Sequence, residues 1–431
     1  MRTSIVWFKT DLRLYDNETL YRAVDQNDYV IPVYCLDDAH YQITDFGFQK
    51  SGNFRTKFLL EALTDLDARL RDIGSGLMVV KGKPEKEIPK IALEYGAQRV
   101  YAKKEVAYEE MNTAEKVEKA LWEIKCSLEV YSTSTLYHSQ DLPFPINEIP
   151  DVFSNFRKHV EKESYVRTVL PSPSAINTPS LPDLKLPSIQ ELGLEPITVD
   201  KRQVLDFKGG ESSGLNRMQY YFYDTKALSI YKETRNGMVG EQYSTKFSPW
   251  LSIGCLSPRG IYHEVKNYEE RYGANDSTYW LIFELLWRDY FRFMMKKYHN
   301  RFFRQNGIKK HEVNLPFHNQ ELLDKWIMGK TGDNFVDANM QELKKSGYMS
   351  NRGRQNVASY LVNDLNLDWR YGAAYFEQQL IDYDVCSNWG NWAYQAGVGN
   401  DPRGKRKFNT EKQAEDYDPD QTYRKLWLKK K

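Results

Sequence analysis

The sequence predicts an α/β domain with a doubly wound parallel sheet, joined by a long connector to an all-α second domain. Three observations carry this prediction. Short apolar runs alternate with amphipathic segments as far as Tyr131, the pattern of a parallel sheet with helices on both faces. Nine of the 17 prolines lie between Pro143 and Pro196, and eight of the ten tryptophans follow Leu205. The expected domains are residues 1–135, 136–204 and 205–431.

The first domain alternates strands and helices. Each expected strand is an apolar run bounded by turn residues, and each expected helix repeats its apolar residues every three or four positions. The expected strands are residues 4–8, 29–35, 77–80, 99–102 and 128–131, and the expected helices are residues 20–24, 54–71, 84–95 and 109–123. Because no Gly-x-Gly-x-x-Gly follows the first strand, a phosphate site of the Rossmann type is not expected there.

The connector is rich in proline and serine and has few periodic patterns. Proline fixes the backbone φ angle, so segments 171–174 and 179–187 are expected to be extended. One helix is expected within the connector, from Val152 to Glu163. Beyond about Leu205 long segments of helical spacing predict the second domain.

Charge and cysteine content limit the class of protein. The 60 Lys and Arg residues nearly balance the 59 Asp and Glu residues, so attraction to nucleic acid would come from a local basic patch. The four cysteines have no paired spacing, which argues against a zinc site or a disulfide framework. Without a leader or an apolar run of membrane length, we expect a cytoplasmic monomer that binds no metal and does not enter a membrane.

The stretch from Tyr348 to Tyr394 carries the strongest chemical signal. Arginines, aspartates and asparagines stand among large aromatic residues on segments with helical spacing. This mixture suits a large, flat ligand with polar edges, because arginine and aspartate can meet the ring edge while tryptophan stacks on the ring or exchanges electrons with it. The alternative is a helical core with a surface salt bridge.

This stretch, together with Tyr231, residues 244–248 and residues 283–292, resembles the flavin-binding domain of the photolyase and cryptochrome family. Residues 349–356 (MSNRGRQN) and 385–388 (VCSN) are similar to its DASH branch. The resemblance runs from Ile5 to Trp427. It implies that the all-α domain binds FAD and that light drives repair of cyclobutane pyrimidine dimers, preferentially in single-stranded DNA.

The alternative function is a blue-light photoreceptor, a cryptochrome that signals through flavin photoreduction without repair. Signalling members of the family often carry a long tail, whereas this chain ends soon after Leu426-Trp427. We therefore expect repair. Repair of duplex DNA is a third possibility. Protein partners cannot be named from the sequence.

The resemblance also implies the flavin-binding residues. Arg354 pairs with Asp382 at the edge of the isoalloxazine ring, and Asn388 lies near flavin N5, where an amide accepts from a protonated nitrogen. From the residues alone, the hydroxyls and lysine of 244–248 form a possible diphosphate cradle or a helix cap. The residues expected to bind FAD are Tyr231, Ser244, Thr245, Lys246, Phe247, Ser248, Glu284, Arg288, Asn351, Arg354, Asp382, Asp384 and Asn388.

The same resemblance implies the substrate site and an electron relay. Trp287 forms a stacking wall for the damaged bases, and Glu284 is a hydrogen-bond partner that can stabilise the dimer radical anion. From the residues alone, Glu284 and Arg288 could instead form an i,i+4 pair on a helix surface. The catalytic residues are expected to be Glu284, Trp287, Asn351, Gln355 and Tyr394, and the electron-transfer residues Trp392 and Trp369.

The chain departs from the family pattern at several positions. The outer tryptophan of the relay should lie shortly before Trp326, but residues 315–318 read Leu-Pro-Phe-His, so a nearby tyrosine is expected to replace it. Gln355 and Tyr394 stand where duplex-repairing relatives carry methionine and tryptophan. Weaker stacking there favours single-stranded DNA, because a dimer in a single strand need not be flipped out of a duplex.

Two further sites are expected. In this family the first domain carries an antenna, and Glu105 resembles the residue that binds the pterin of a folate, here 5,10-methenyltetrahydrofolate; the alternatives are a solvated charged face and a domain without a ligand. Basic residues interleaved with Tyr298, Phe302 and Phe303 resemble a groove that follows a nucleic-acid backbone, or a solvated face. These basic residues are Lys296, Lys297, Arg301, Arg304, Lys309, Lys310, Arg352 and residues 403–407.

Overall fold

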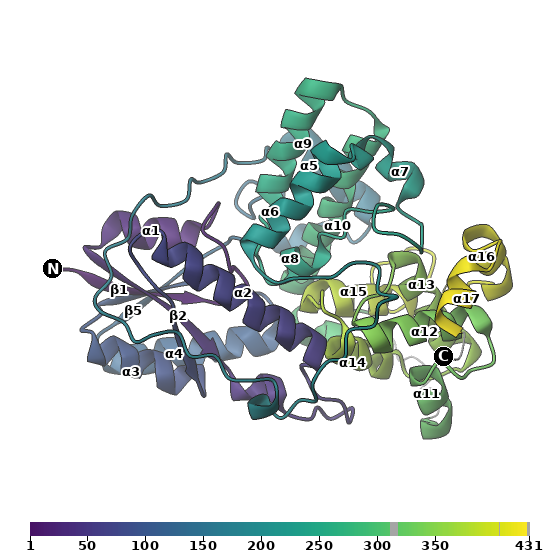
Figure 1. The fold of residues 1–431 in the computed structure, drawn as a ribbon, viewed down its shortest axis with the longest axis horizontal. Helices are drawn as coiled ribbons and strands as arrows, with labels where there is room; N and C mark the ends of the chain where they lie inside the picture. The colour runs from purple at the N-terminus through teal and green to yellow at the C-terminus, as the bar shows by residue number, and fades with distance from the viewer. Residues whose placement is uncertain (311–317, 405, 429–431) are drawn as a thin grey trace.

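The computed structural model describes residues 1–310, 318–404 and 406–428. An α/β domain at the N-terminus abuts a larger helical domain, and the chain ends in α16 and α17 at the far end of that helical domain (Figure 1). The predicted combination of a parallel sheet domain and an all-α domain is confirmed.

The sheet of the first domain has the order β3-β2-β1-β4-β5, and every neighbouring pair is parallel. Strand order runs outward from β1 on both sides, so the connecting helices lie on both faces of the sheet. The strands are β1 (Thr3–Phe8), β2 (Tyr29–Leu36), β3 (Met78–Lys81), β4 (Arg99–Lys103) and β5 (Ser127–Tyr131).

Alternate residues of the central strand enter different cores. Val6 and Phe8 belong to the core that contains helices α1 (Glu18–Gln26) and α2 (Asn53–Arg71). Ile5 and Trp7 belong to the core that contains α3 (Pro84–Glu94) and α4 (Tyr108–Glu123). Successive side chains of a strand point to opposite faces, which is why a continuous apolar run marks a strand buried on both sides. Figure 1 shows the two helix pairs on opposite faces of the sheet.

The connector is packed along the first domain. The backbone N–H groups of Asp16 and Val30 donate to the carbonyl oxygens of Leu170 and Asn177, each at 2.9 Å, and the N–H of Ile176 donates to Ile73 at 2.9 Å. The predicted helix is present as α5 (Phe153–Glu163). Because the proline-rich chain makes these hydrogen bonds with the sheet domain, it is held in place.

The helical domain is built around α10 (Asp276–Tyr298), which begins with a capping box on Asn275. Its other helices are α6 (Glu211–Gln219), α7 (Tyr231–Thr234), α8 (Ser248–Ser252), α9 (Pro258–Tyr272), α11 (Gln320–Ile327), α12 (Asn334–Ser346), α13 (Asn351–Ser359), α14 (Trp369–Gln379), α15 (Val385–Gln395), α16 (Thr410–Tyr417) and α17 (Thr422–Leu428). Two π-helical turns, Tyr220–Asp224 and Tyr360–Asp364, follow α6 and α13.

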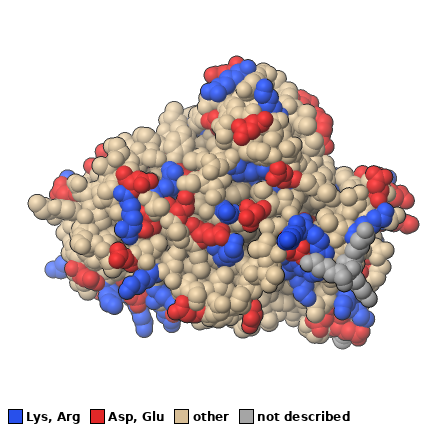
Figure 2. All heavy atoms as spheres, viewed as in Figure 1, with Lys and Arg blue, Asp and Glu red and all other residues tan. Residues whose placement is uncertain are grey.

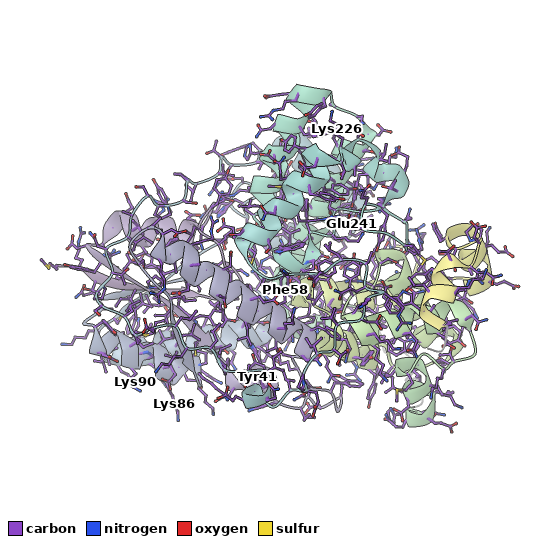
Figure 3. The ribbon with its side chains drawn as sticks, viewed as in Figure 1. Tyr41, Phe58, Lys86, Lys90, Lys226 and Glu241 are labelled. Atoms are coloured by element: carbon purple, nitrogen blue, oxygen red, sulfur yellow. The ribbon has the colours of Figure 1, made fainter. Side chains whose placement is uncertain are left out.

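Buried groups join the two domains. Phe58 of α2 packs edge-on against Trp250 of α8, with ring centres 5.9 Å apart; Figure 3 labels Phe58 at this junction. Both carboxylate oxygens of Glu211 accept backbone N–H groups of the first domain, from Leu14 at 2.8 Å and Tyr15 at 3.1 Å. A side chain at Gly209 would collide with the backbone of Phe58, so glycine permits α6 to approach α2.

Within the described residues, no helix combines the length and apolar character that crossing a membrane requires. The cysteines Cys35, Cys126, Cys255 and Cys386 are all buried and free.

Candidate functional site

The start of α13 and the turn before α15 form one side of the predicted flavin site. Ser350 caps α13 by accepting the N–H of Gly353 at 3.1 Å. One turn later, Arg354 donates from Nη2 to Asp382 Oδ2 at 2.8 Å and from Nε to the carbonyl of Met349 at 2.9 Å. The Asp382 side chain is 1% exposed, and its Oδ1 has no partner among the described residues. The predicted pair is therefore formed and leaves one buried acceptor unused.

The first turn of α15 presents two more of the predicted residues. Asp384 accepts the N–H of Ser387 at 2.8 Å and so caps the helix. Burial raises the pKa of Asp384, but the charges of Arg288 and Arg292 and the Ser387 hydrogen bond outweigh burial and hold this pKa below its ordinary value. Asn388 is buried and donates to the carbonyl of Ala373 at 3.0 Å, so its own oxygen remains to accept.

The segment 244–248 is held by Arg217, which donates to the carbonyl oxygens of Thr245 at 3.0 Å and Ser244 at 3.2 Å. Lys246 is 3% exposed, and its Nζ has no hydrogen-bond partner among the described residues. Burial and the nearby charge of Arg217 lower its pKa to about 6, although Glu342 and Glu241 oppose them. The Lys246 Nζ instead lies over the Tyr243 ring, 3.2 Å from the ring centre. A buried amine that donates no hydrogen bond, beside main-chain loops, is suited to an anionic group.

Other predicted residues of this region differ in exposure. Phe247 is buried against Phe222, whose ring centre lies 5.9 Å away, and Tyr231 is buried in α7. Burial also raises the pKa of the Tyr231 hydroxyl well above its ordinary value. Ser248 is exposed at the start of α8. The segment thus combines buried aromatic rings with an exposed hydroxyl.

The charged residues of α10 make contacts that the sequence did not indicate. Glu284 accepts from Arg235 Nη1 at 2.6 Å, and Arg288 donates to the carbonyl oxygens of Ser134 and Leu251. The surface i,i+4 pair between Glu284 and Arg288 is therefore wrong, because both partners find closer groups on other segments. Burial raises the pKa of Glu284 despite the opposing charge of Arg235.

Trp287 and Tyr394 form a perpendicular pair of rings with centres 5.9 Å apart. One face of Trp287 is covered by Phe153 of α5, which stacks at 3.7 Å and 13°. Arg406 donates to the Tyr394 hydroxyl at 3.0 Å. The two half-buried rings from α10 and α15 are thus fixed at right angles.

Asn351 and Gln355 lie one turn apart on α13. Asn351 is exposed, and the Gln355 carbonyl oxygen accepts from Arg352 Nη1 at 3.1 Å. Arg352 also stacks over Tyr417 of α16, with its guanidinium 4.3 Å from the ring centre, and donates to Asn236 at 3.0 Å. The C-terminal helix α16 thereby borders the predicted substrate side of α13.

The two predicted relay tryptophans are buried, at 3% exposure for Trp392 and 4% for Trp369. The Trp392 ring lies against Gly372, where a Cβ atom would come within 2.2 Å of the ring, and Gly372 is about one turn beyond Trp369 on α14. The expected outer position, residues 315–317, lies outside the described residues.

Glu105 is buried at the junction of the two domains. Its Oε2 accepts from Arg292 Nη2 at 3.0 Å, and its Oε1 lies 3.3 Å from Lys103 Nζ. Burial raises the pKa of Glu105, but the charges of Lys103, Arg292 and Lys9 outweigh burial and lower this pKa to about 2. The nearby Nζ of Lys9 is buried over the Trp7 ring, 4.5 Å from its centre, and has no hydrogen-bond partner among the described residues. The alternative of a solvated charged face is wrong for Glu105.

Four basic residues of the expected groove are paired with acids. Lys297 lies 2.8 Å from Asp151, Lys407 lies 2.6 Å from Asp364, and Arg403 and Arg406 both pair with Asp401. Phe302 is 1% exposed and cannot stack on a base. On the face in Figure 2, basic and acidic residues are interspersed. This groove therefore depends on fewer residues than the sequence indicated.

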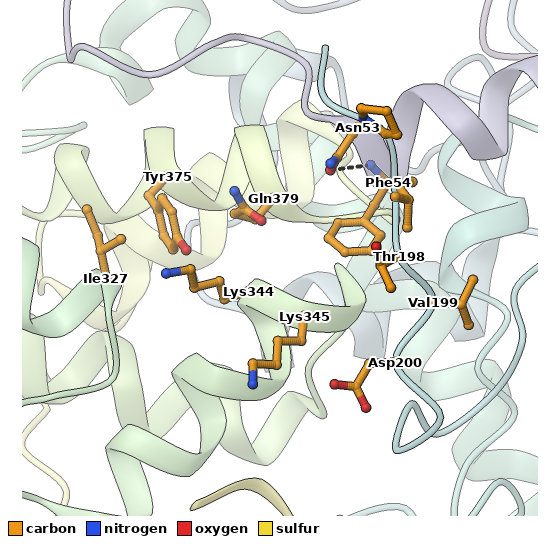
Figure 4. A pocket seen from close by; sticks show the side chains of 12 residues that line it. Asn53, Phe54, Thr198, Val199, Asp200, Ile327, Lys344, Lys345, Tyr375 and Gln379 are labelled. Carbon is orange, nitrogen blue, oxygen red and sulfur yellow. Dashed lines mark hydrogen bonds between the residues drawn. The ribbon is translucent and has the colours of Figure 1, made fainter. Parts of the chain in front are cut away.

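A cavity of about 520 Å³ lies away from these residues, where the connector crosses α12 and α14. Figure 4 shows Lys344 and Tyr375 on one side of it and Phe54 and Val199 on the other. It contains none of the predicted site residues.

Three residues of the site were not singled out from the sequence. Arg235 binds Glu284, Phe153 supports Trp287, and Glu342 faces Lys246 from α12. Arg235 follows Tyr231 by one helical turn, a spacing that could have drawn attention to it. Phe153 and Glu342 are far away in sequence, and no local pattern marks them.

Comparison with known proteins gives two family matches and near full-length relatives. Residues 4–176 match the DNA photolyase model, and residues 280–430 match the model of the FAD binding domain of DNA photolyase. The chain is 48% identical to the Cryptochrome DASH of Gloeobacter violaceus, over 99% of this chain and 85% of that protein.

Two solved structures extend the comparison. The Synechocystis cryptochrome superposes with a TM-score of 0.96 at 48% identity, over 99% of this chain and 89% of the other. An archaeal photolyase from Sulfolobus tokodaii with two FAD molecules superposes with a TM-score of 0.78 at 26% identity, over 99% and 90% of the two chains.

Proposed function

Because the chain belongs to the photolyase and cryptochrome family, in its DASH branch, we propose that it uses FAD and blue light to repair cyclobutane pyrimidine dimers, preferentially in single-stranded DNA. The observation that supports repair best is the perpendicular pair of Trp287 and Tyr394 beside Glu284. The two bases of a dimer are inclined to each other. Two aromatic rings at right angles can therefore each contact one of the bases.

The described residues fit an FAD molecule. Among the described residues, Lys246 Nζ and Asp382 Oδ1 are buried without hydrogen-bond partners, so the phosphate side has an unused donor and the ring side an unused acceptor. The side-chain nitrogen of Asn388 donates to the carbonyl of Ala373, so the side-chain oxygen of Asn388 is the atom left to accept a hydrogen bond from flavin. When bound and reduced, FAD supplies one light-excited electron to the dimer and regains it after the ring splits.

Glu284 is proposed to stabilise the negative charge on the dimer. An ionised carboxylate would repel that charge, whereas a protonated one can donate a hydrogen bond to it. Burial raises the pKa of Glu284 although Arg235 at 2.6 Å opposes the rise, so this carboxyl takes up a proton more readily than a free one as negative charge develops beside it. Arg235 adds a positive charge to the same place.

The preference for single strands follows from energetics at Gln355 and Tyr394. Flipping a dimer out of a duplex costs a few kcal/mol, and stacking on an aromatic ring contributes roughly 1–3 kcal/mol per base. Tyr394 has a smaller ring than tryptophan, and Gln355 is engaged by Arg352. The stacking energy available is therefore close to the energy that flipping consumes.

The test is blue-light repair of a thymine dimer in a single-stranded oligonucleotide and in the matching duplex, with flavin chemically reduced beforehand. We expect repair of the single strand and at least about tenfold slower repair of the duplex, since 1.4 kcal/mol of flipping cost already gives that factor. Equal repair of both would contradict the argument from Gln355 and Tyr394. No repair of either would favour the photoreceptor.

Binding of FAD is expected to weaken as pH rises above about 6, because the diphosphate favours a charged Lys246 whereas the free site has a Lys246 pKa of about 6. Each pH unit should lower the affinity by up to about tenfold. Burial raises the pKa of Glu342 to about 8, so its ionisation above that pH would add a negative charge and weaken binding further.

The measurement is the dissociation constant of FAD for the apoprotein between pH 5.5 and 8, by flavin fluorescence. A Lys246→Met variant, which keeps most of the apolar stem, should bind FAD more weakly and show a flat profile over this range. A slope in the variant equal to that of the wild type would assign the proton to another group.

A folate antenna at the domain junction is the proposed second chromophore, with Glu105 as a ligand of the pterin. The Lys9 Nζ near Glu105, which has no hydrogen-bond acceptor among the described residues, supports a ligand there. The purified protein should show a near-ultraviolet band beyond that of flavin, and Glu105→Gln should lower antenna affinity at least about tenfold, given ~1.5–3 kcal/mol for a hydrogen bond to a charged group. Glu129→Gln on the edge strand β5 is the control.

A wild-type spectrum without an extra band would contradict the folate assignment. A second flavin band would instead indicate an antenna like the second FAD of the Sulfolobus tokodaii structure.

We further propose that the domains are residues 1–135, 136–204 and 205–431 and that the protein acts as a cytoplasmic monomer. The four free, buried cysteines support a reducing compartment.

A further inference from the structure

We propose that electrons enter the relay at Tyr371 and reach Trp369 through Trp389. This inference rests on the proposed flavin cofactor, which both repair and photoreception require. The sequence has no tryptophan between Trp287 and Trp326, so the expected outer tryptophan is missing. Trp389 of α15 packs edge-on against Trp369, with ring centres 5.7 Å apart. It is therefore an oxidisable ring in contact with the inner relay.

The hydrogen bonds of the two tryptophans set the direction of transfer. The indole N–H of Trp369 donates to the neutral carbonyl of Gln305 at 3.0 Å. The indole N–H of Trp389 donates to the carboxylate of Glu377 at 3.3 Å, and that side chain is buried. A carboxylate stabilises the positive charge of an oxidised indole more than a carbonyl does, and low-dielectric surroundings strengthen this effect. An electron vacancy formed on Trp369 is thus drawn to Trp389.

Beyond Trp389 a chain of ring contacts leads to a tyrosine. Phe46 lies 6.3 Å from Trp389 and 5.2 Å from Tyr371, centre to centre. Phenylalanine is hard to oxidise, so Phe46 acts as a bridge between the two oxidisable rings. Tyr371 is half-buried on α14. Because an oxidised phenol must release its proton, contact with water allows the step to finish there.

A second branch from Trp392 leads to a buried end. Trp326 lies 6.2 Å from Trp392, and Tyr375 lies 5.8 Å from Trp326. Trp326 and Tyr375 are 0% and 3% exposed. Burial raises the pKa of the Tyr375 hydroxyl, and the indole N–H of Trp326 donates to the neutral carbonyl of Val357 at 3.0 Å rather than to a carboxylate. The buried branch is therefore disfavoured and supplies a matched control.

The steps balance in electrons and protons. Trp392 gives one electron to light-excited, oxidised flavin, and Trp369 and then Trp389 refill the vacancy in turn. Tyr371 finally gives one electron to Trp389 and its phenolic proton to water. The net result is one electron on the flavin, a neutral tyrosyl radical at Tyr371 and one proton in solution.

The test uses the flavin-loaded full chain with oxidised flavin under laser flashes. We expect a tyrosyl radical in freeze-quench electron paramagnetic resonance, and a spin-trap adduct that mass spectrometry maps to Tyr371. Formation of this radical should slow in D₂O. In Tyr371→Phe and in Trp389→Phe the tyrosyl signal should vanish, and the separated charges should recombine at least about tenfold faster, as a barrier lower by ~1.4 kcal/mol would give.

Tyr375→Phe, on the same helix, should keep the tyrosyl signal. An adduct on another tyrosine, a signal that persists in Tyr371→Phe, or its loss in Tyr375→Phe would overturn the route. The spin-trap mapping on the wild-type chain needs no variant, so misfolding of a variant leaves the test intact. A radical at Tyr371 in a protein that repairs no dimer would support this route and exclude the proposed repair.

Discussion

A Trp392→Phe variant is expected to lose photoreduction of its flavin. Phenylalanine is far harder to oxidise than tryptophan, and Trp392 is the predicted first donor. The rate of photoreduction should fall by at least about two orders of magnitude, since a barrier raised by only ~2.7 kcal/mol has that effect. The measurement is the bleaching of the oxidised-flavin absorption band under steady blue light with an external thiol.

Trp326→Phe is the matched control for this experiment. Trp326 is equally buried, packs edge-on against Trp392 at 6.2 Å, and donates its indole N–H to Val357. It loses the same ring volume but lies off the predicted route, so photoreduction should persist. A normal rate in Trp392→Phe would show that another residue is the first donor. A lost rate in Trp326→Phe alone would place the route along the buried branch.

An Asp382→Asn variant is expected to release its flavin and to unfold at lower temperature. In the wild type, Asp382 balances the charge of Arg354 at 2.8 Å. In the variant, Arg354 would keep its charge without this carboxylate. Removing one partner of a buried ion pair costs about 3–5 kcal/mol of unfolding free energy. Because a quarter of the Arg354 side chain reaches solvent, we expect a value near the lower end of that range. Flavin retention after gel filtration and thermal unfolding of the apoprotein are the two measurements.

Asp141→Asn separates a flavin effect from a stability effect. Asp141 makes a two-point ion pair with Arg167 at 2.6 and 2.8 Å in the connector, where the Asp141 side chain is 13% exposed. This variant should lose stability and retain flavin. If both variants release flavin equally, Asp382 acts through stability and the direct role at the ring edge is wrong.

The sheet domain was predictable because its signal is local. A strand buried on both faces must be apolar at consecutive positions, as at Ile5, Val6, Trp7 and Phe8. Amphipathic helices between such runs then allow few topologies. The helix within the connector was found for the same reason, whereas the hydrogen bonds that hold Leu170 and Asn177 against the sheet leave no pattern in the sequence.

The candidate site was predictable where its residues share a segment or a family motif. Arg354 and Asp382 stand 28 residues apart, yet the motif resemblance predicted their pair. The partner of Glu284 was not predictable from helical spacing. Arg288 is four residues away, but Arg235, directly after α7, binds the same carboxylate. The i,i+4 spacing identifies only neighbours on the same helix, whereas a buried carboxylate can pair with a cation on any segment packed beside it.

The sequence by itself determined the architecture, the cofactor class and the residue types of the site, because apolar periodicity and long motifs are properties of the chain. The tertiary structure alone decided which groups meet. It placed Phe153 behind Trp287, buried Lys246 without a hydrogen-bond acceptor among the described residues and put Trp389 between Trp369 and Phe46. These contacts join segments that are far apart in the chain. They depend on how the helices pack against one another, and no local sequence pattern encodes that packing.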